Sequence, residues 1–308
     1  MLYDLAIIGG GPAGVAAGVY AARKRLKTIF ITKDFGGQSA VSVGIQNWIG
    51  TVEVSGLDFA EMLKKHLFHY ANDIVDIREG ETVEKIEKTD SGFKVKTANF
   101  EYAAKTVLVA AGSRRRKLPA KNADKFEHRG ITYCASCDGP LFSGKNVVVV
   151  GGGNAAFETA AQLLAYCPSV TLIHRSSNFR ADPVTVEKVL SHPNMKVVKN
   201  AEIIEVLGEK TVEAVIYQDK TTGQTVTRPV QGIFVEIGSV PATEFVKDLV
   251  ELNQWNQIVV DPKNQRTSLT GIWAAGDGSD GLYHQNNIAA GDAVKALEDI
   301  YYFLHAGK

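Results

Sequence analysis

Two cysteines separated by two residues stand near the middle of the chain, in the stretch Cys134-Ala-Ser-Cys137-Asp138. Thiols at this spacing could form half of a zinc site, a structural disulfide, or a dithiol/disulfide pair that carries two electrons. The aspartate that follows could protonate a departing thiolate as a general acid, or cap the next turn. Which chemistry applies depends on the elements that surround these residues.

A metal site is the weaker interpretation of this motif. Structural zinc needs four ligands, and the chain offers neither a second CxxC nor an HxxxH pattern. Cys167 and His128 would complete such a site only by an accident of folding. A structural disulfide is disfavoured because closing so short a loop constrains the unfolded chain little. We therefore predict no metal and an electron-carrying cysteine pair, whose thiol pKa is lowered if it lies at a helix start.

An internal repeat indicates which structural elements surround the cysteine pair. Residues 5–17, LAIIGGGPAGVAA, resemble residues 147–159, VVVVGGGNAAFET. Each segment reads as an apolar strand, a glycine turn and an alanine-rich helix. Both turns fit the dinucleotide fingerprint, in which glycines permit the turn and let the backbone approach a pyrophosphate at the helix N-terminus. The fingerprint positions are Gly9, Gly11 and Gly14 in the first copy and Gly151, Gly153 and Ala156 in the second. Two copies predict one site for a flavin and one for its electron donor.

The strand after the second fingerprint helix indicates which donor binds. It ends in His174-Arg175, with Arg180 five residues further on and no acid between them. A carboxylate there favours a free ribose 2′-hydroxyl, whereas arginine favours a 2′-phosphate. This favours NADP(H) over NAD(H). The alternative is that both arginines lie on a solvated surface. The corresponding strand of the first copy, residues 28–32, also ends without an acid and says little about its ribose.

Two further stretches have the composition of flavin contacts. Gly36-Gly37-Gln38 follows the first-copy strand, where a glycine turn can approach a ligand closely. Near the C-terminus, a short strand leads to Gly276-Asp277 and to a helix expected to begin around His284. The aspartate could accept hydrogen bonds from ribitol hydroxyls. A helix N-terminus there could stabilise negative charge on a flavin.

In this order and spacing, the motifs resemble the low-molecular-weight, bacterial-type thioredoxin reductases, and the resemblance runs from end to end. It implies an α/β fold with two Rossmann-like, three-layer dinucleotide-binding domains, the second inserted into the first. Residues 1–114 and 245–308 would form the FAD-binding domain. Residues 115–244 would form the NAD(P)H-binding-like domain that carries the CxxC motif. The family also forms homodimers through its FAD domains, which we expect here.

The resemblance also implies the site residues. Cys137 would be the sulfur nearer the flavin, Cys134 the one that attacks the partner's disulfide, and Asp138 the general acid. The residues expected to bind FAD are Gly9, Gly11, Pro12, Ala13, Gly14, Gly36, Gly37, Gln38, Asn47, Ala111, Gly112, Gly276, Asp277, His284 and Gln285. The residues expected to bind NADPH are Gly151, Gly153, Asn154, Ala155, Ala156, His174, Arg175 and Arg180. Electrons would pass from NADPH through FAD and the cysteine pair to thioredoxin or a similar small redox protein.

Departures from the family pattern leave other readings open. Ser176 follows Arg175 where the family usually has a second arginine, and His284 stands where arginine is usual. NADH or ferredoxin therefore stays open as the donor. Stretches around the CxxC motif also resemble the flavoprotein of alkyl hydroperoxide reductase, so a peroxiredoxin-linked partner is a second option. A flavin redox sensor without turnover is disfavoured, because it would need no second nucleotide site.

The bulk composition limits the partners. The chain has 34 basic and 34 acidic residues, which argues against a nucleic-acid binder. No stretch approaches the roughly 18 unbroken apolar residues of a membrane helix. The N-terminal MLYDLAIIGGG has neither a basic region nor a cleavage-like site. With three cysteines in total, the chain is expected in the reducing cytoplasm and away from membranes.

Overall fold

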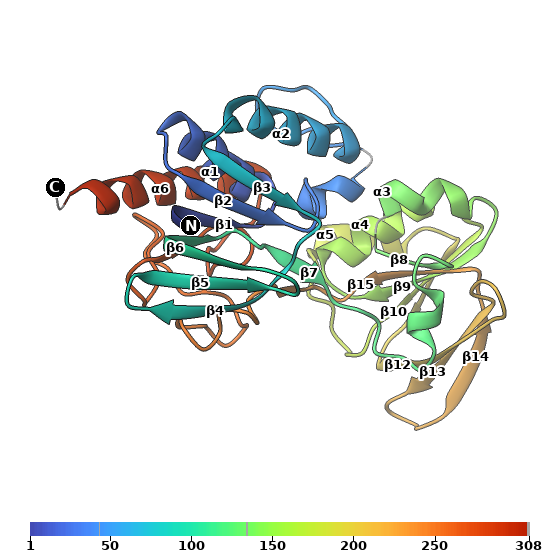
Figure 1. Cartoon of the computed structure of the whole chain (residues 1–308). Helices are drawn as coiled ribbons and strands as arrows, with labels where there is room; N and C mark the ends of the chain where they lie inside the picture. The colour runs from blue at the N-terminus through green and yellow to red at the C-terminus, as the bar shows by residue number, and fades with distance from the viewer. Residues whose placement is uncertain (43, 134, 307–308) are drawn as a thin grey trace. The chain divides into compact units, whose positions relative to one another are not determined.

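The computed structural model describes residues 1–42, 44–133 and 135–306, and the side chains of Val41, Ser136 and Cys137 lie outside that description (Figure 1). The chain divides into two compact units. The flanking unit comprises residues 1–114 and 240–308, and the inserted unit comprises residues 115–239. The second crossing between them lies a few residues before the expected boundary at 244/245. The two crossings run through the short strands β7 (Ser113–Arg115) and β16 (Ser239–Pro241).

The flanking unit contains a seven-stranded sheet in the order β3-β2-β1-β6-β5-β4, with β17 also paired to β6. Strands β1, β2, β3, β6 and β17 run parallel to one another, whereas β5 pairs antiparallel with both β6 and β4. The strands are β1 (Leu2–Ile8), β2 (Thr28–Thr32), β3 (Val75–Glu79), β4 (Val83–Thr89), β5 (Gly92–Thr97), β6 (Glu101–Val109) and β17 (Ile272–Ala274). Parallel pairing brings the carboxyl ends of β1, β2, β6 and β17 to one edge.

Both faces of this sheet are covered, as the near-continuous apolar sequence of β1 requires. Leu5 and Ile7 face one core cluster, and Ala6 and Ile8 face the other. The first cluster includes apolar residues of three helices, α1 (Pro12–Arg23), α2 (Gly56–Ala71) and α6 (Asn286–His305). A short 3-10 helix, η1 (Gly37–Val41), follows β2. Apolar residues of α1, α2 and α6 thus cover one face of the sheet.

The inserted unit repeats this plan on a smaller scale. Its five-stranded sheet has the order β11-β10-β9-β15-β8 and every pair is parallel. A three-stranded antiparallel sheet, β12-β13-β14, accompanies it. The strands are β8 (Ile131–Thr132), β9 (Asn146–Gly151), β10 (Ser169–Ile173), β11 (Met195–Val198), β12 (Ala201–Leu207), β13 (Ala214–Asp219), β14 (Thr225–Pro229) and β15 (Gly232–Glu236). The helices are η2 (Ala123–Phe126), α3 (Ala135–Asp138), η3 (Gly139–Phe142), α4 (Asn154–Leu163) and α5 (Pro183–Leu190).

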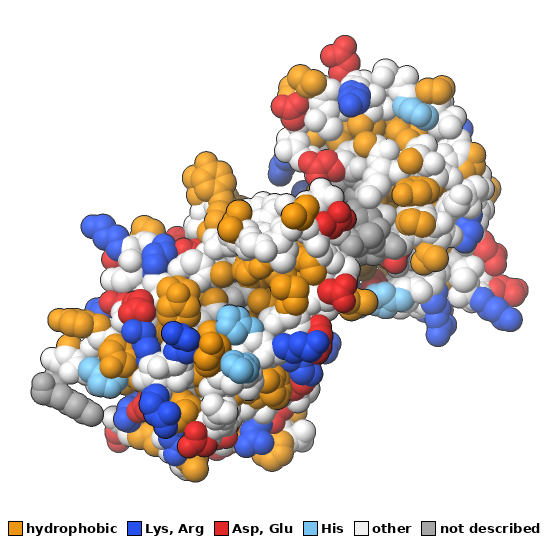
Figure 2. All heavy atoms as spheres, turned by 90° about the horizontal axis from the view of Figure 1, so that it is seen from above, with side chains coloured by type: hydrophobic (Ala, Val, Ile, Leu, Met, Phe, Trp, Pro, Cys, Tyr) orange, Lys and Arg blue, Asp and Glu red, His pale blue; other side chains and the backbone are white. Residues whose placement is uncertain are grey.

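The predicted α/β fold class is therefore confirmed: each unit has a set of parallel strands, with a strand–turn–helix fingerprint among them. Acidic and basic side chains are interspersed on the face drawn in Figure 2, in keeping with the zero net charge of the sequence. Among the described residues, no helix is both long enough and apolar enough to cross a membrane.

Candidate cofactor and redox sites

In the first fingerprint turn, a side chain would clash at two of the three glycines and would find open space at the third. Gly9 has a φ of +116°, and a Cβ there would lie 2.2 Å from the carbonyl oxygen of Ala110. A Cβ on Gly14 would lie 1.8 Å from the carbonyl oxygen of Gly9. A Cβ on Gly11 would meet no heavy atom of the described residues within 4 Å. The outer glycines are thus required by the turn and by helix packing, and the middle one leaves space at the helix N-terminus, as a bound pyrophosphate needs.

Helix α1 begins directly behind this open position. Its N-cap residue is Gly11, which supplies no side-chain hydrogen bond, and Pro12 occupies the first helical position. The N–H groups of the first turn therefore have no side-chain acceptor at the N-cap, and the helix dipole adds positive potential there. This end of the helix is suited to a phosphate.

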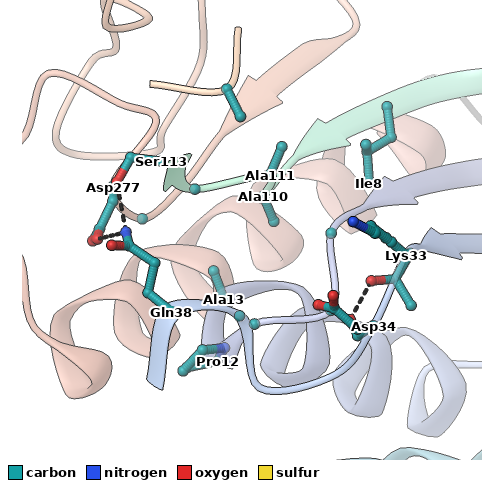
Figure 3. A pocket seen from close by; sticks show the side chains of 18 of the residues that line it. Ile8, Pro12, Ala13, Lys33, Asp34, Gln38, Ala110, Ala111, Ser113 and Asp277 are labelled. Carbon is teal, nitrogen blue, oxygen red and sulfur yellow. Dashed lines mark hydrogen bonds between the residues drawn. The ribbon is translucent and has the colours of Figure 1, made fainter. Parts of the chain in front are cut away.

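A cavity of about 520 Å³ lies over this turn (Figure 3). Its wall comes from the carboxyl ends of β1, β2, β6 and β17. It contains these residues that the sequence predicted for FAD: Gly9, Gly11, Pro12, Ala13, Gly36, Gly37, Gln38, Ala111, Gly112, Gly276 and Asp277. Gly14 does not line the cavity and instead packs beneath the turn. Segments separated by more than 200 residues of sequence thus meet in one cavity.

Three polar side chains of the cavity wall, those of Gln38, Ser113 and Asp277, lie together. The amide Nε2 of Gln38 donates to Ser113 Oγ at 2.6 Å and lies 3.4 Å from Asp277 Oδ2 (Figure 3). Gly36 and Gly37 both have positive φ, which brings Gln38 around toward β17. The amide and the carboxylate could bind hydroxyl groups of a ligand in the cavity.

A second cavity of about 530 Å³ shares Gln38 and Asp277 with the first. It adds the remaining residues predicted for FAD: Asn47, His284 and Gln285. Asn47 Nδ2 donates to Gln285 Oε1 at 3.0 Å, and His284 Nδ1 lies 3.5 Å from Asp277 Oδ1. Helix α6 begins at Asn286, immediately after these residues. An extended ligand in the first cavity would therefore reach a helix N-terminus in the second.

Some lining residues were not predicted from the sequence. Lys33 and Asp34 follow β2, and Glu81 precedes β4. Glu81 accepts hydrogen bonds from Tyr102 and from Thr97 Oγ1, each at 3.0 Å. Burial and this carboxylate raise the pKa of Tyr102 to about 12. The available signal for Asp34 was an acid two residues beyond the end of β2, whereas the expectation concerned only the last residue of the strand.

The second fingerprint turn repeats the pattern of the first. Gly151 has a φ of +152°, and a Cβ there would lie 2.3 Å from the carbonyl oxygen of Glu236. Gly153 is the N-cap of α4 with no side-chain hydrogen bond, and a Cβ there would meet no heavy atom within 4 Å in the described part of the chain. Ala156 is fully buried. The predicted Asn154 accepts a hydrogen bond from the backbone N–H of Asp182 at 2.8 Å, and Ala155 follows it in the first turn of α4.

The cationic residues predicted for a nucleotide phosphate stand close to this turn. The imidazole of His174 covers Gly152, since a Cβ on that glycine would lie 2.3 Å from Nδ1. His174 Nε2 donates to the carbonyl oxygen of Asn178 at 3.0 Å, and the backbone N–H of Arg180 donates to the carbonyl oxygen of Gly152 at 2.8 Å. Arg175 and Arg180 are exposed, and neither forms an ion pair within the described residues.

Glu236, which the sequence analysis did not single out, lies at the end of β15 beside this turn. Its side chain is only 6% exposed. Thr159 Oγ1 donates to Oε1 at 2.8 Å, and Arg115 Nη1 donates to Oε2 at 3.0 Å. Burial is the largest influence on this carboxyl and raises its pKa above the usual range, although both hydrogen bonds act in the opposite direction.

The redox motif is described only in part. Cys134 and the side chain of Cys137 lie outside the described residues. Asp138 ends α3 and is partly buried, and Thr132 Oγ1 donates a hydrogen bond to its Oδ2. The third cysteine, Cys167, is buried in the core of the inserted unit, and burial raises its pKa to about 11. Within the described residues, no group of three or more His, Cys, Asp or Glu could hold a metal ion.

Comparison with known proteins places this chain. Residues 3–293 match the family described as pyridine nucleotide-disulphide oxidoreductase. The chain is 36% identical over 303 residues to an NADH dehydrogenase of Bacillus subtilis (strain 168), covering 98% of this chain and 58% of that protein. It is 40% identical over 297 residues to an alkyl hydroperoxide reductase protein of Pseudomonas putida, covering 96% and 56%. The chain thus spans somewhat more than half the length of these two relatives.

Solved structures match over nearly their whole length. The thioredoxin reductase of Lactococcus lactis matches with a TM-score of 0.83 and 30% identity, covering 98% of this chain and 99% of that one. The thioredoxin reductase of T. acidophilum matches with a TM-score of 0.80 and 34% identity, covering 98% of each chain. The resemblance to bacterial-type thioredoxin reductases is thereby confirmed. The chain belongs to the pyridine nucleotide-disulphide oxidoreductase family.

Proposed function

We propose that this protein is an FAD-dependent disulfide reductase that passes electrons from NADPH, through the Cys134–Cys137 pair, to thioredoxin or a similar small redox protein. The observation that carries the proposal is the pair of fingerprint turns, each with an open middle glycine at an uncapped helix N-terminus. One turn lies under a cavity with polar side chains. The other lies beside exposed cations. The two sites therefore suit two different nucleotides.

The residues present fit FAD at the first site. Gly11 leaves room for the pyrophosphate. Gln38 and Asp277 offer an amide and a carboxylate to the ribitol hydroxyls, and the N-terminus of α6 lies beside the second cavity. When bound, FAD would accept a hydride from the nicotinamide and pass two electrons to a disulfide. The chain's own part is to bind and orient it.

The thiol chemistry is assigned to the CxxC motif from its sequence. The Cys134 thiolate attacks one sulfur of the partner's disulfide, a mixed disulfide forms, and the departing partner thiolate takes a proton from Asp138. The Cys137 thiolate then attacks the Cys134 sulfur and expels the second partner thiolate, which takes a proton from water. The partner gains two electrons and two protons, and the cysteine pair is oxidised. The nicotinamide nucleotide supplies the electrons that restore it.

The hydrogen bond from Thr132 supports the role of Asp138. It holds one carboxyl oxygen in place, which orients the acid and leaves the other oxygen to carry the proton. By resemblance to the family, we also propose a homodimer and a cytoplasmic location.

A second candidate shares the cofactors but differs in partner or donor. Relatives are named as an NADH dehydrogenase and as an alkyl hydroperoxide reductase protein. These names favour NADH as an alternative donor and a peroxiredoxin-linked protein as an alternative acceptor. Ferredoxin is a further alternative donor, since Ser176 departs from the two-arginine pattern.

The proposal is tested by an anaerobic titration of the purified flavoprotein with NADPH, NADH and reduced ferredoxin in separate experiments. We expect rapid bleaching of the flavin absorbance with NADPH, followed by reduction of a thioredoxin disulfide. Cys134→Ser should keep the bleaching and lose thioredoxin reduction. Cys167→Ser, which changes the buried cysteine, is the matched control and should keep both. Bleaching by ferredoxin and by neither nicotinamide would contradict the proposed donor.

A further inference from the structure

Lys199 lies level with the residues that end β10. It follows β11, which pairs in parallel with β10 so that Val198 is opposite Ile173. The backbone N–H of His174 donates to the carbonyl oxygen of Val198 at 2.9 Å. The residue after β11 and the residue after β10 therefore reach the same edge of the sheet.

The turn that carries Lys199 lies against Ser176, the position where the family pattern has a second arginine. Asn200 has a φ of +51°, and its backbone N–H lies 3.4 Å from the carbonyl oxygen of Ser176. Ala201 then donates to the carbonyl oxygen of His174 at 3.0 Å. The left-handed residue thus turns the chain back along the end of β10 and fixes Lys199 beside the serine.

An aromatic ring holds the ammonium group of Lys199 in this position. Its Nζ lies 4.4 Å from the ring centroid of Phe179, a distance at which a cation is attracted to the ring. The centroid of that ring lies 4.9 Å from the ring centroid of Phe157 and 5.4 Å from that of His174. The ammonium group is therefore tied to the same side chain as the imidazole that covers the fingerprint turn.

The nearby acids already have partners. The carboxylate of Asp182 caps α5, accepting from the N–H groups of Val184 and Thr185 at 2.9 and 3.2 Å. Glu202 lies 3.6 Å from Lys220. Within the described residues, Lys199 forms no ion pair and neither does Arg175 or Arg180. In the described part of the chain, the segments that follow β10 and β11 thus carry three cations, Arg175, Arg180 and Lys199, without a carboxylate bound to them.

We propose that Lys199 is a specificity-determining residue: with Arg175 and Arg180 it binds the 2′-phosphate of the nicotinamide nucleotide, supplying the charge that Ser176 does not. The inference rests on the proposed nucleotide site and deepens it. Lysine suits this role as a compact point charge. Lys199, directly after the neighbouring strand β11, would thus take the place of the arginine that is absent at position 176, and the chain would favour a 2′-phosphorylated nucleotide.

The test is calorimetric titration of the FAD-loaded protein with 2′,5′-ADP and with 5′-AMP, which differ only by the 2′-phosphate. We expect Lys199→Ala to weaken 2′,5′-ADP binding about tenfold, the effect of losing one charge-assisted contact. Binding of 5′-AMP should change less than about twofold, and Lys199→Arg should retain most of the preference. Lys196→Ala removes an exposed lysine from β11 itself and is the matched control, with no expected effect.

The outcomes separate this inference from the proposed donor. If wild-type protein prefers 2′,5′-ADP and Lys199→Ala binds it equally well, the role of Lys199 is overturned while the NADPH proposal stands. If wild-type protein binds the two ligands equally, both are overturned. Equal loss of both ligands in Lys199→Ala would also overturn the inference, because the lysine would then not distinguish the phosphate.

Discussion

The two fingerprint turns are alike in their backbone and different in what surrounds them. In each, the first glycine has positive φ and faces a carbonyl oxygen, and the middle glycine is open. The first turn lies under a cavity whose polar lining groups include the amide of Gln38 and the carboxylate of Asp277. The second lies beside exposed arginines. The same local motif thus leaves space at two helix N-termini, and the side chains around that space differ between the two units; we call each such space a cradle.

The difference also suits different lifetimes of the two complexes. A ligand that fills a cavity between strand ends and helix N-termini buries much of its surface, which favours a resident cofactor. A phosphate held by exposed cations is screened by salt and exchanges more readily. Under the proposed function, this difference would suit a resident flavin in the flanking unit and an exchangeable nicotinamide nucleotide in the inserted unit.

The largest effect should come from filling the open glycines. Gly11→Val and Gly153→Val place a branched side chain where each cradle is free of described heavy atoms within 4 Å. Because that space is the proposed pyrophosphate position, we expect each change to weaken binding of its own nucleotide at least about 100-fold. Gly11→Val should lose flavin, measured by absorbance after gel filtration. Gly153→Val should keep flavin and lose nicotinamide nucleotide binding, measured by calorimetry.

A control separates this loss from a general effect of glycine replacement. Gly291→Ala lies in the exposed part of α6, where an added Cβ is likewise more than 4 Å from every described heavy atom outside the helix's own backbone and the flanking residues. It should keep both nucleotides. If Gly153→Val lost flavin as well, the two cradles would not be independent, and their assignment to separate ligands would be wrong.

A smaller effect is expected from removing the hydrogen bond that orients the carboxyl group of Asp138. Thr132→Val removes the hydroxyl that donates to Asp138 Oδ2 and nearly preserves the volume. We expect the rate of thioredoxin reduction to fall about tenfold, because a misoriented acid provides only part of the rate enhancement of general acid catalysis. Thr132→Ser should restore most of the rate. Stopped-flow rates across pH 6 to 9 would check this; a uniform loss in Val and Ser variants alike would indicate a packing defect instead.

The sequence predicted the cradles because their physics is local. Gly9, Gly11 and Gly14 lie within six residues, and their spacing alone predicts the turn and the helix N-terminus. Lys33 and Glu81 reach the same cavity only because the strand order β3-β2-β1-β6 brings their loops to one edge. No pattern within either segment indicates that proximity. These two lining residues were therefore missed, although the fold class that brings them together was predicted.

Glu236 illustrates the same limit and gives the smallest predicted effect. Nothing in its strand sequence indicates that Thr159 and Arg115 meet its carboxylate. Because burial raises its pKa, the folded protein binds a proton there more tightly than the unfolded chain does. Stability from this group is therefore fully present below the usual value of 4.5 and declines as pH rises through the raised pKa.

The variant Glu236→Gln tests this sign. The amide is neutral at every pH, and its oxygen can still accept a hydrogen bond from Thr159 Oγ1. Because the side chain of Arg115 is exposed, water can solvate its charge. We expect the variant to be more stable than wild type at pH 7 by about 1 kcal/mol or less, and the difference to shrink as pH falls toward 4.5. Urea unfolding at both pH values measures it. A variant less stable at pH 7 would mean that the ion pair with Arg115 outweighs the cost of burying the charge, and that β7 is anchored to the second cradle through that pair.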